Sequence, residues 1–144
     1  MRQYPAAVLF DLDDTLISFE GVSQQAWDDC CADFIARHRP AFTKESLLGA
    51  IHSMRSWYWS DLQRHKVGRE NIGQARRDVV GLALTTFGLT DAGLIRELAD
   101  QYTATQDALI YRFPNTIVVL DALRAHGVRL VLVTNGTSQG QRAK

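Results

Sequence analysis

The sequence has few cysteines, no net charge and no long hydrophobic run. Its only cysteines, Cys30 and Cys31, are adjacent and give no disulfide framework, so we expect a cytoplasmic protein. The 16 basic and 16 acidic side chains cancel, which argues against nucleic acid or an anionic membrane as a partner. No apolar stretch approaches the roughly 20 residues of a membrane-spanning helix. A length of 144 residues allows one domain, or one modest domain with an insertion.

Two apolar runs lie near the two ends of the chain, at residues 6–10 and 128–133. Runs of this kind are typical of strands buried on both faces of a parallel sheet. The region between them has helical periodicity, with apolar residues at three- and four-residue spacing. The pattern predicts four helices, followed by a fifth before the second strand; they cover about residues 22–35, 43–58, 72–87, 90–102 and 115–127.

Three carboxylates follow the first apolar run, at Asp11, Asp13 and Asp14. Charges crowded in this way repel one another and resist desolvation, and a bound Mg²⁺ would relieve both effects. Asp11 and Asp13 alternate, so in an extended strand end they point to the same side. One carboxylate can then act as a nucleophile and the other as a general acid and base. The alternative is an acidic turn in which Asp14 and Thr15 cap a helix.

The second apolar run ends in Thr134, Asn135 and Gly136. A hydroxyl group and backbone N–H groups beside a glycine, at the end of a strand, suit a phosphate oxygen. The alternative is a polar loop that caps the next helix through Thr137 or Ser138. Two such motifs at the ends of two parallel strands favour a shared site.

These two motifs resemble those of a known enzyme superfamily. The stretch 10–16, Phe-Asp-Leu-Asp-Asp-Thr-Leu, resembles the first motif of the haloacid dehalogenase-like hydrolases, and 131–136, Val-Leu-Val-Thr-Asn-Gly, resembles the second. The helical region between them resembles the cap of the phosphatase branch that carries its cap between these motifs. The resemblance implies an α/β fold: a Rossmann-like parallel sheet core, apparently truncated, from residues 1–18 and 112–144, with an inserted α-helical cap at 19–111.

The resemblance also implies a role for each motif residue. Asp11 would attack phosphorus and form an aspartyl-phosphate, and Asp13 would protonate the leaving oxygen and then activate water. The Asp11 carboxylate and the Asp13 backbone carbonyl would hold Mg²⁺. Thr134 and the Asn135 backbone N–H would bind the phosphate of a small phosphorylated metabolite. Dehalogenases of the superfamily lack an acid at the position of Asp13, so its presence favours a phosphatase.

The family's third motif, a lysine, and its fourth, an acidic pair, come after the second motif by some tens of residues. This sequence ends at Lys144, ten residues after Thr134. We therefore expect the chain to be the N-terminal part of the hydrolase, inactive alone, with a sheet edge exposed to self-association. The alternative is a non-enzymatic remnant or binding module of the same fold.

Overall fold

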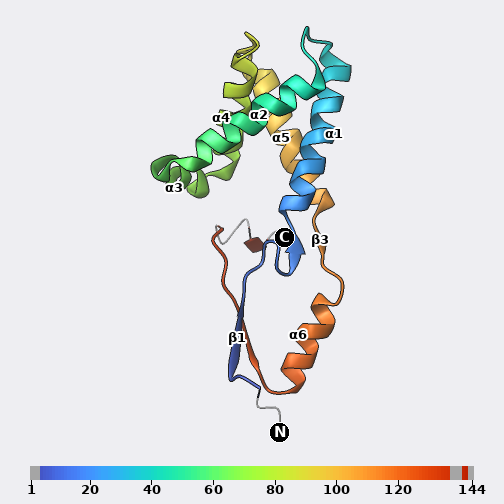
Figure 1. Ribbon diagram of the computed structural model, residues 1–144, viewed down its shortest axis with the longest axis vertical. Helices are drawn as coiled ribbons and strands as arrows, with labels where there is room; N and C mark the ends of the chain where they lie inside the picture. The colour runs from blue at the N-terminus through green and yellow to red at the C-terminus, as the bar shows by residue number, and fades with distance from the viewer. Residues whose placement is uncertain (1–3, 137–140, 143–144) are drawn as a thin grey trace. The chain divides into compact units, whose positions relative to one another are not determined.

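The computed structural model describes residues 4–136 and 141–142 of the chain (Figure 1). The chain divides into two compact units. The first, here called the core unit, comprises Met1–Val22 and Ile110–Lys144, and the second, the helical unit, comprises Ser23–Leu109. The caps suggested for Thr137 and Ser138 lie outside the described residues.

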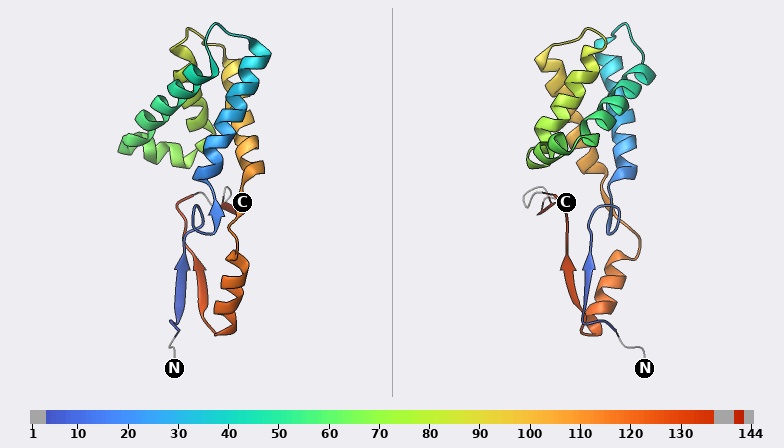
Figure 2. Two further views of the ribbon diagram at one scale, coloured as in Figure 1. Left: turned by 45° about the vertical axis from the view of Figure 1, so that its right-hand side comes forward. Right: turned by 60° about the vertical axis from the view of Figure 1, so that its left-hand side comes forward.

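The core unit contains two strands that run in parallel. Strand β1 (Ala7–Phe10) pairs with β4 (Arg129–Leu132), in a register that places Ala7 opposite Arg129 and Phe10 opposite Leu132. Helix α6 (Thr116–Ala125) precedes β4 and packs against it (Figure 2). This order confirms the predicted strand, helical insertion, helix and strand, and the α/β class of the fold.

The prediction that both strands are buried on their two faces is wrong for the described residues. Leu9 of β1 is 66% exposed, and Leu132 of β4 is 51% exposed. A sheet of two short strands and one helix has no second layer to cover its other face, so apolar side chains stay in contact with solvent. Pairing of a second copy with this sheet stays a prediction.

A second, antiparallel strand pair in the core unit was not visible in the sequence. Strand β2 (Ile17–Ser18) pairs with β3 (Tyr111–Arg112), joining segments nearly one hundred residues apart in the chain. The Leu16 carbonyl extends this connection by accepting hydrogen bonds from the Phe113 backbone N–H at 3.1 Å and the Thr116 hydroxyl at 3.1 Å. Strands of two residues are too short to show a period in the sequence.

The helical unit has five helices where the pattern predicts four. Asp61 explains the difference, because its carboxylate accepts hydrogen bonds from the Gln63 and Arg64 backbone N–H groups and so begins a separate helix. That helix carries little apolar periodicity, and its Leu62 is 86% exposed. The five helices are α1 (Glu20–His38, whose first residues belong to the core unit), α2 (Lys44–Ser60), α3 (Leu62–Glu70), α4 (Ile72–Thr85) and α5 (Ala92–Leu109). None of the helices in the described part of the chain is long and apolar enough to cross a membrane.

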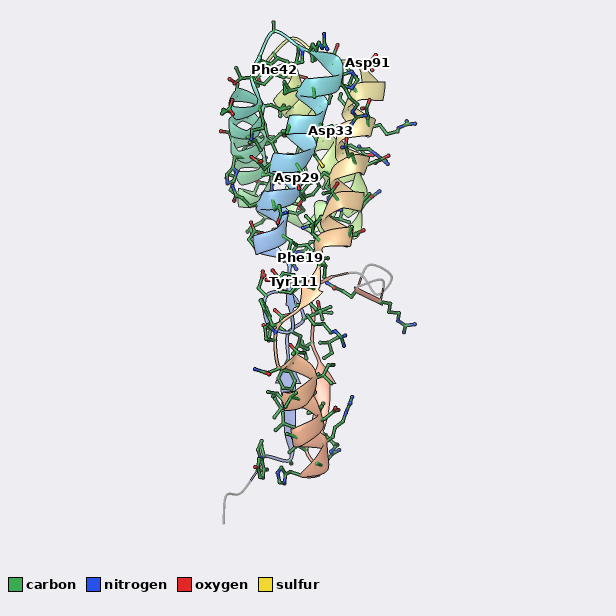
Figure 3. The ribbon with its side chains drawn as sticks, turned by 90° about the vertical axis from the view of Figure 1, so that its right-hand side faces the viewer. Phe19, Asp29, Asp33, Phe42, Asp91 and Tyr111 are labelled. Carbon is green, nitrogen blue, oxygen red and sulfur yellow. The ribbon has the colours of Figure 1, made fainter. Side chains whose placement is uncertain are left out.

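The helical unit has its own hydrophobic core. The Trp27 ring of α1 stacks on Tyr102 of α5, with centroids 3.6 Å apart, and Cys30 and Cys31 are buried in the same cluster. Burial raises the pKa of the Cys31 thiol to about 12, so this side chain serves packing and not thiolate chemistry. At the surface, Asp33 of α1 (Figure 3) accepts a hydrogen bond from the Gln101 amide of α5 at 2.6 Å. The largest fully buried apolar side chains are Phe34, Leu47, Ile51, Leu84 and Leu98.

Helix α3 approaches the end of α2 closely at Gly68, which is buried. A Cβ atom at Gly68 would lie 2.9 Å from ring atoms of both Trp59 and Tyr58. We expect Gly68→Ala to lower the free energy of unfolding by about 1–3 kcal/mol, because the rings must shift within a packed core.

The matched control is Gly49→Ala on α2, where a Cβ meets nothing within 4 Å. This substitution should raise stability by about 0.5–1 kcal/mol, since alanine loses less backbone entropy in a helix. Urea unfolding followed by tryptophan fluorescence measures both, because all three tryptophans lie in the helical unit. Equal effects of the two substitutions would contradict the close approach at Gly68.

Candidate active site

Asp14 serves the structure of the turn that follows β1. Its backbone has a positive φ of 54°, a conformation that Asp and Asn tolerate better than most residues. Its Oδ1 accepts hydrogen bonds from the Phe19 N–H at 2.9 Å and the Glu20 N–H at 3.0 Å, at the start of α1. A negative charge there also favours the positive end of the helix dipole. The helix-capping alternative therefore holds for Asp14.

We expect Asp14→Ala to cost about 1–3 kcal/mol of stability, from the lost cap and from alanine at positive φ. Asp14→Asn is the control, because its amide oxygen still accepts the two hydrogen bonds. Urea unfolding followed by circular dichroism measures the difference, and equal loss in the two variants would mean that the side-chain oxygen does not act as the cap.

Asp11 and Asp13 lie just beyond the end of β1. Asp11 is exposed, and its Oδ1 accepts a hydrogen bond from the Leu12 N–H at 2.7 Å. The Leu12 carbonyl accepts hydrogen bonds from the backbone N–H groups of Leu16 at 2.9 Å and Ile17 at 3.2 Å, so the acidic segment forms a tight turn. This turn separates the exposed Asp11 from the half-buried Asp13. The two carboxylates therefore differ in their exposure to solvent.

Thr134 and Asn135 follow β4 at the same end of the sheet. The Val133 N–H donates to the Phe10 carbonyl at 2.8 Å, which continues the strand pairing one residue beyond its last partner pair. Because the strands are parallel, Asp11 and Thr134 both lie at the edge of the sheet formed by the carboxyl ends of β1 and β4. This is the edge at which open α/β sheets bind ligands.

One contact of this edge was not predicted from the sequence. The Gln141 amide donates to Asp13 Oδ2 at 3.4 Å. A glutamine seven residues after Thr134 belongs to no motif, so the sequence carries no signal for this contact. Gln141 therefore lies against the half-buried Asp13 carboxyl group.

The predicted Mg²⁺ ligands give a small donor set. Within residues 4–136 and 141–142, no group of three or more His, Cys, Asp or Glu side chains could hold a metal ion. The Asp11 carboxylate and the Asp13 carbonyl remain as oxygen donors, and oxygen is the ligand that Mg²⁺ prefers. Mg²⁺ commonly keeps several waters and takes only one or two carboxylates, so this pair is compatible with it.

Two carboxylates therefore follow β1, and a threonine follows the neighbouring parallel strand β4. The sequence profile of the haloacid dehalogenase-like hydrolases matches residues 5–144, and the chain belongs to this family. Among curated proteins, none matches this chain.

Solved structures similar to this chain include the following three. A 2-haloacid dehalogenase from Pseudomonas syringae pv. Tomato DC3000 has 23% sequence identity and a TM-score of 0.54, with 93% of this chain and 56% of that chain covered. A dehalogenase has 19% identity and a TM-score of 0.48, with 95% and 54% covered. A predicted phosphoglycolate phosphatase from Haemophilus somnus 129PT has 19% identity and a TM-score of 0.49, with 96% and 55% covered. The chain thus spans about half the length of these proteins. At 23% identity, the similarity to the 2-haloacid dehalogenase shows the fold alone.

Proposed function

We propose that this chain is the N-terminal part of a Mg²⁺-dependent hydrolase that cleaves a small phosphomonoester through an aspartyl-phosphate on Asp11. The supporting observation is that Asp11 and Thr134 follow adjacent parallel strands at one edge of the sheet, with Asp13 close behind in the turn. That edge carries a nucleophile, an acid and a phosphate-binding hydroxyl group, which are the groups that phosphoryl transfer to a carboxylate requires.

In the first step, an Asp11 carboxylate oxygen forms a bond to phosphorus while the bond from phosphorus to the leaving oxygen breaks. Asp13 donates its proton to that leaving oxygen. In the second step, water loses a proton to Asp13, its oxygen bonds to phosphorus, and the bond from phosphorus to Asp11 breaks. The Thr134 hydroxyl and the Asn135 N–H hold the phosphoryl oxygens throughout.

Mg²⁺ is held in this proposal by the Asp11 carboxylate and the Asp13 backbone carbonyl. When bound, it offsets the negative charge of the carboxylate and the phosphoryl group. The helical unit would act as the cap that selects the substrate. The remaining ligands, and a lysine that balances charge, would come from a later part of the full-length protein, so the 144-residue chain alone would turn over little or no substrate.

A comparison of two substrates tests this function in the full-length protein. With Mg²⁺ present, we expect p-nitrophenyl phosphate to be hydrolysed and 2-chloropropionate to release no chloride. Chloride release without phosphate release would show a dehalogenase, and would contradict the role given to Asp13. Hydrolysis of neither would support a binding module of the same fold.

A further inference from the structure

The side chain of Gln141 lies directly against the backbone of Gly136, which is the second residue after Thr134. A Cβ atom at position 136 would lie 2.6 Å from the Gln141 Cδ and 2.7 Å from its Cγ. Cβ atoms do not approach other atoms so closely, so any residue but glycine would push the Gln141 side chain aside. The backbone φ of Gly136 is not positive, so it is space, and not backbone conformation, that requires glycine here.

The same side chain contacts the candidate acid. Its Nε2 donates to Asp13 Oδ2 at 3.4 Å, and its Oε1 is buried with no hydrogen-bond partner among the described residues. If the amide were turned the other way, Oε1 would face the Asp13 carboxylate, where two acceptors repel each other. The Asp13 carboxylate and the space over Gly136 therefore fix both the place and the direction of the Gln141 amide.

This contact determines which Asp13 oxygen carries the proton of the acid. An N–H group that points at Oδ2 leaves no room for a hydrogen on that oxygen, so the proton is carried by Oδ1. A donor–acceptor distance of 3.4 Å is long, and catalytic hydrogen bonds of this kind often shorten only when substrate binds.

We propose that Gln141 is a positioning residue that turns the proton-bearing oxygen of Asp13 toward the leaving group, and that Gly136 provides the space in which the Gln141 amide lies. Gln141 acts through Asp13 and needs no contact with the substrate. All three residues belong to the core unit. The proposal rests on the acid and base role proposed for Asp13.

Two aryl phosphates of nearly the same size test this role in the full-length protein. Phenolate is a much poorer leaving group than p-nitrophenolate, so hydrolysis of phenyl phosphate depends more on a proton from Asp13. We expect Gln141→Leu to lower kcat/KM for phenyl phosphate about three- to tenfold, and for p-nitrophenyl phosphate about twofold or less, because one hydrogen bond to the acid is lost. A glutamine that only packs would, when removed, lower both values equally.

Gly136→Ala tests the same contact and keeps both Asp13 and Gln141. Its Cβ should displace the Gln141 amide, so we expect the same preferential loss of kcat/KM with phenyl phosphate. In a Gln141→Ala background, which has no Cγ or Cδ to displace, adding Gly136→Ala should cause almost no further loss. Two residues that act through one contact give such non-additive effects.

The contact itself can be followed without turnover. In the ¹⁵N-labelled full-length protein, Gly136→Ala should move the side-chain amide resonances of Gln141, which Gln141→Ala identifies by their absence. Gly49→Ala is the matched control, because a Cβ there meets nothing within 4 Å, and it should leave these resonances in place.

Wild-type turnover separates this proposal from the proposed function. If the wild-type protein hydrolyses neither aryl phosphate, the proposed function and the role of Gln141 are both contradicted. If it hydrolyses them, equal losses for the two substrates in Gln141→Leu, or additive losses when Gly136→Ala is combined with Gln141→Ala, would overturn the role of Gln141 alone. Should Gly136→Ala fail to fold, the two-substrate comparison of Gln141→Leu still decides.

Discussion

Asp11→Asn should lower steady turnover of p-nitrophenyl phosphate by the full-length protein to below about 1% of wild type. Asparagine has nearly the same shape as aspartate, but its amide cannot form an acyl-phosphate by attack on phosphorus. Among the described residues, the exposed Asp11 side chain accepts one hydrogen bond, from the Leu12 N–H, so the fold should survive the change. Initial rates at saturating substrate measure the effect.

Asp14→Asn is the matched control for this prediction. It makes the same chemical change three residues away, in the residue that caps α1, and it should leave most of the activity in place. Activity that survives in Asp11→Asn but disappears in Asp14→Asn would exchange the roles of the two carboxylates and contradict the proposed nucleophile.

Asp13→Asn should reduce turnover by about a hundredfold or more, because proton transfer by a positioned acid and base contributes that much. The loss of kcat/KM, which reports the first step, should depend on the leaving group. An alkyl phosphate, which needs a proton on its leaving oxygen, should suffer more than p-nitrophenyl phosphate, whose leaving group departs easily.

Gln141→Leu is a companion variant, since Gln141 donates to Asp13 Oδ2 at 3.4 Å without taking part in proton transfer. It should reduce the rate much less than Asp13→Asn. A loss of kcat/KM in Asp13→Asn that is equal for both kinds of leaving group would mean that Asp13 does not protonate the leaving oxygen.

The parts of the fold that the sequence predicts are those with strong periodicity or strong caps. The helix predicted over about residues 43–58 is confirmed as α2, which begins where the Thr43 hydroxyl accepts a hydrogen bond from the Ser46 N–H. Helix α3 was missed because its apolar residues, such as Leu62, face solvent and leave no stripe. Strands β2 and β3 were missed because two residues show no period, and their pairing depends on contacts distant in sequence.

In the candidate site, too, the sequence predicts some features and the folded structure is needed for others. The motifs identify Asp11, Asp13 and Thr134, but spacing alone leaves open which carboxylates cap a helix and which face a ligand. The hydrogen bonds to Phe19 and Glu20 decide this for Asp14, and they require the folded turn. The prediction that the strands are buried was wrong because an apolar run shows only that a strand can be covered on both faces. In the described residues no layer covers Leu9, which stays exposed.

The most direct test of the proposed mechanism is to trap the covalent phosphoryl group on Asp11. Asp13→Asn in the full-length protein, mixed with p-nitrophenyl phosphate and Mg²⁺ and quenched in acid, should accumulate this species, because the leaving group departs without help while water attack lacks its base. Peptide mass spectrometry should find one phosphoryl group on the peptide containing Asp11, and none when Asp11→Asn is added. Release of p-nitrophenol with every Asp11 peptide unmodified, or a phosphoryl group on another residue, would contradict the account.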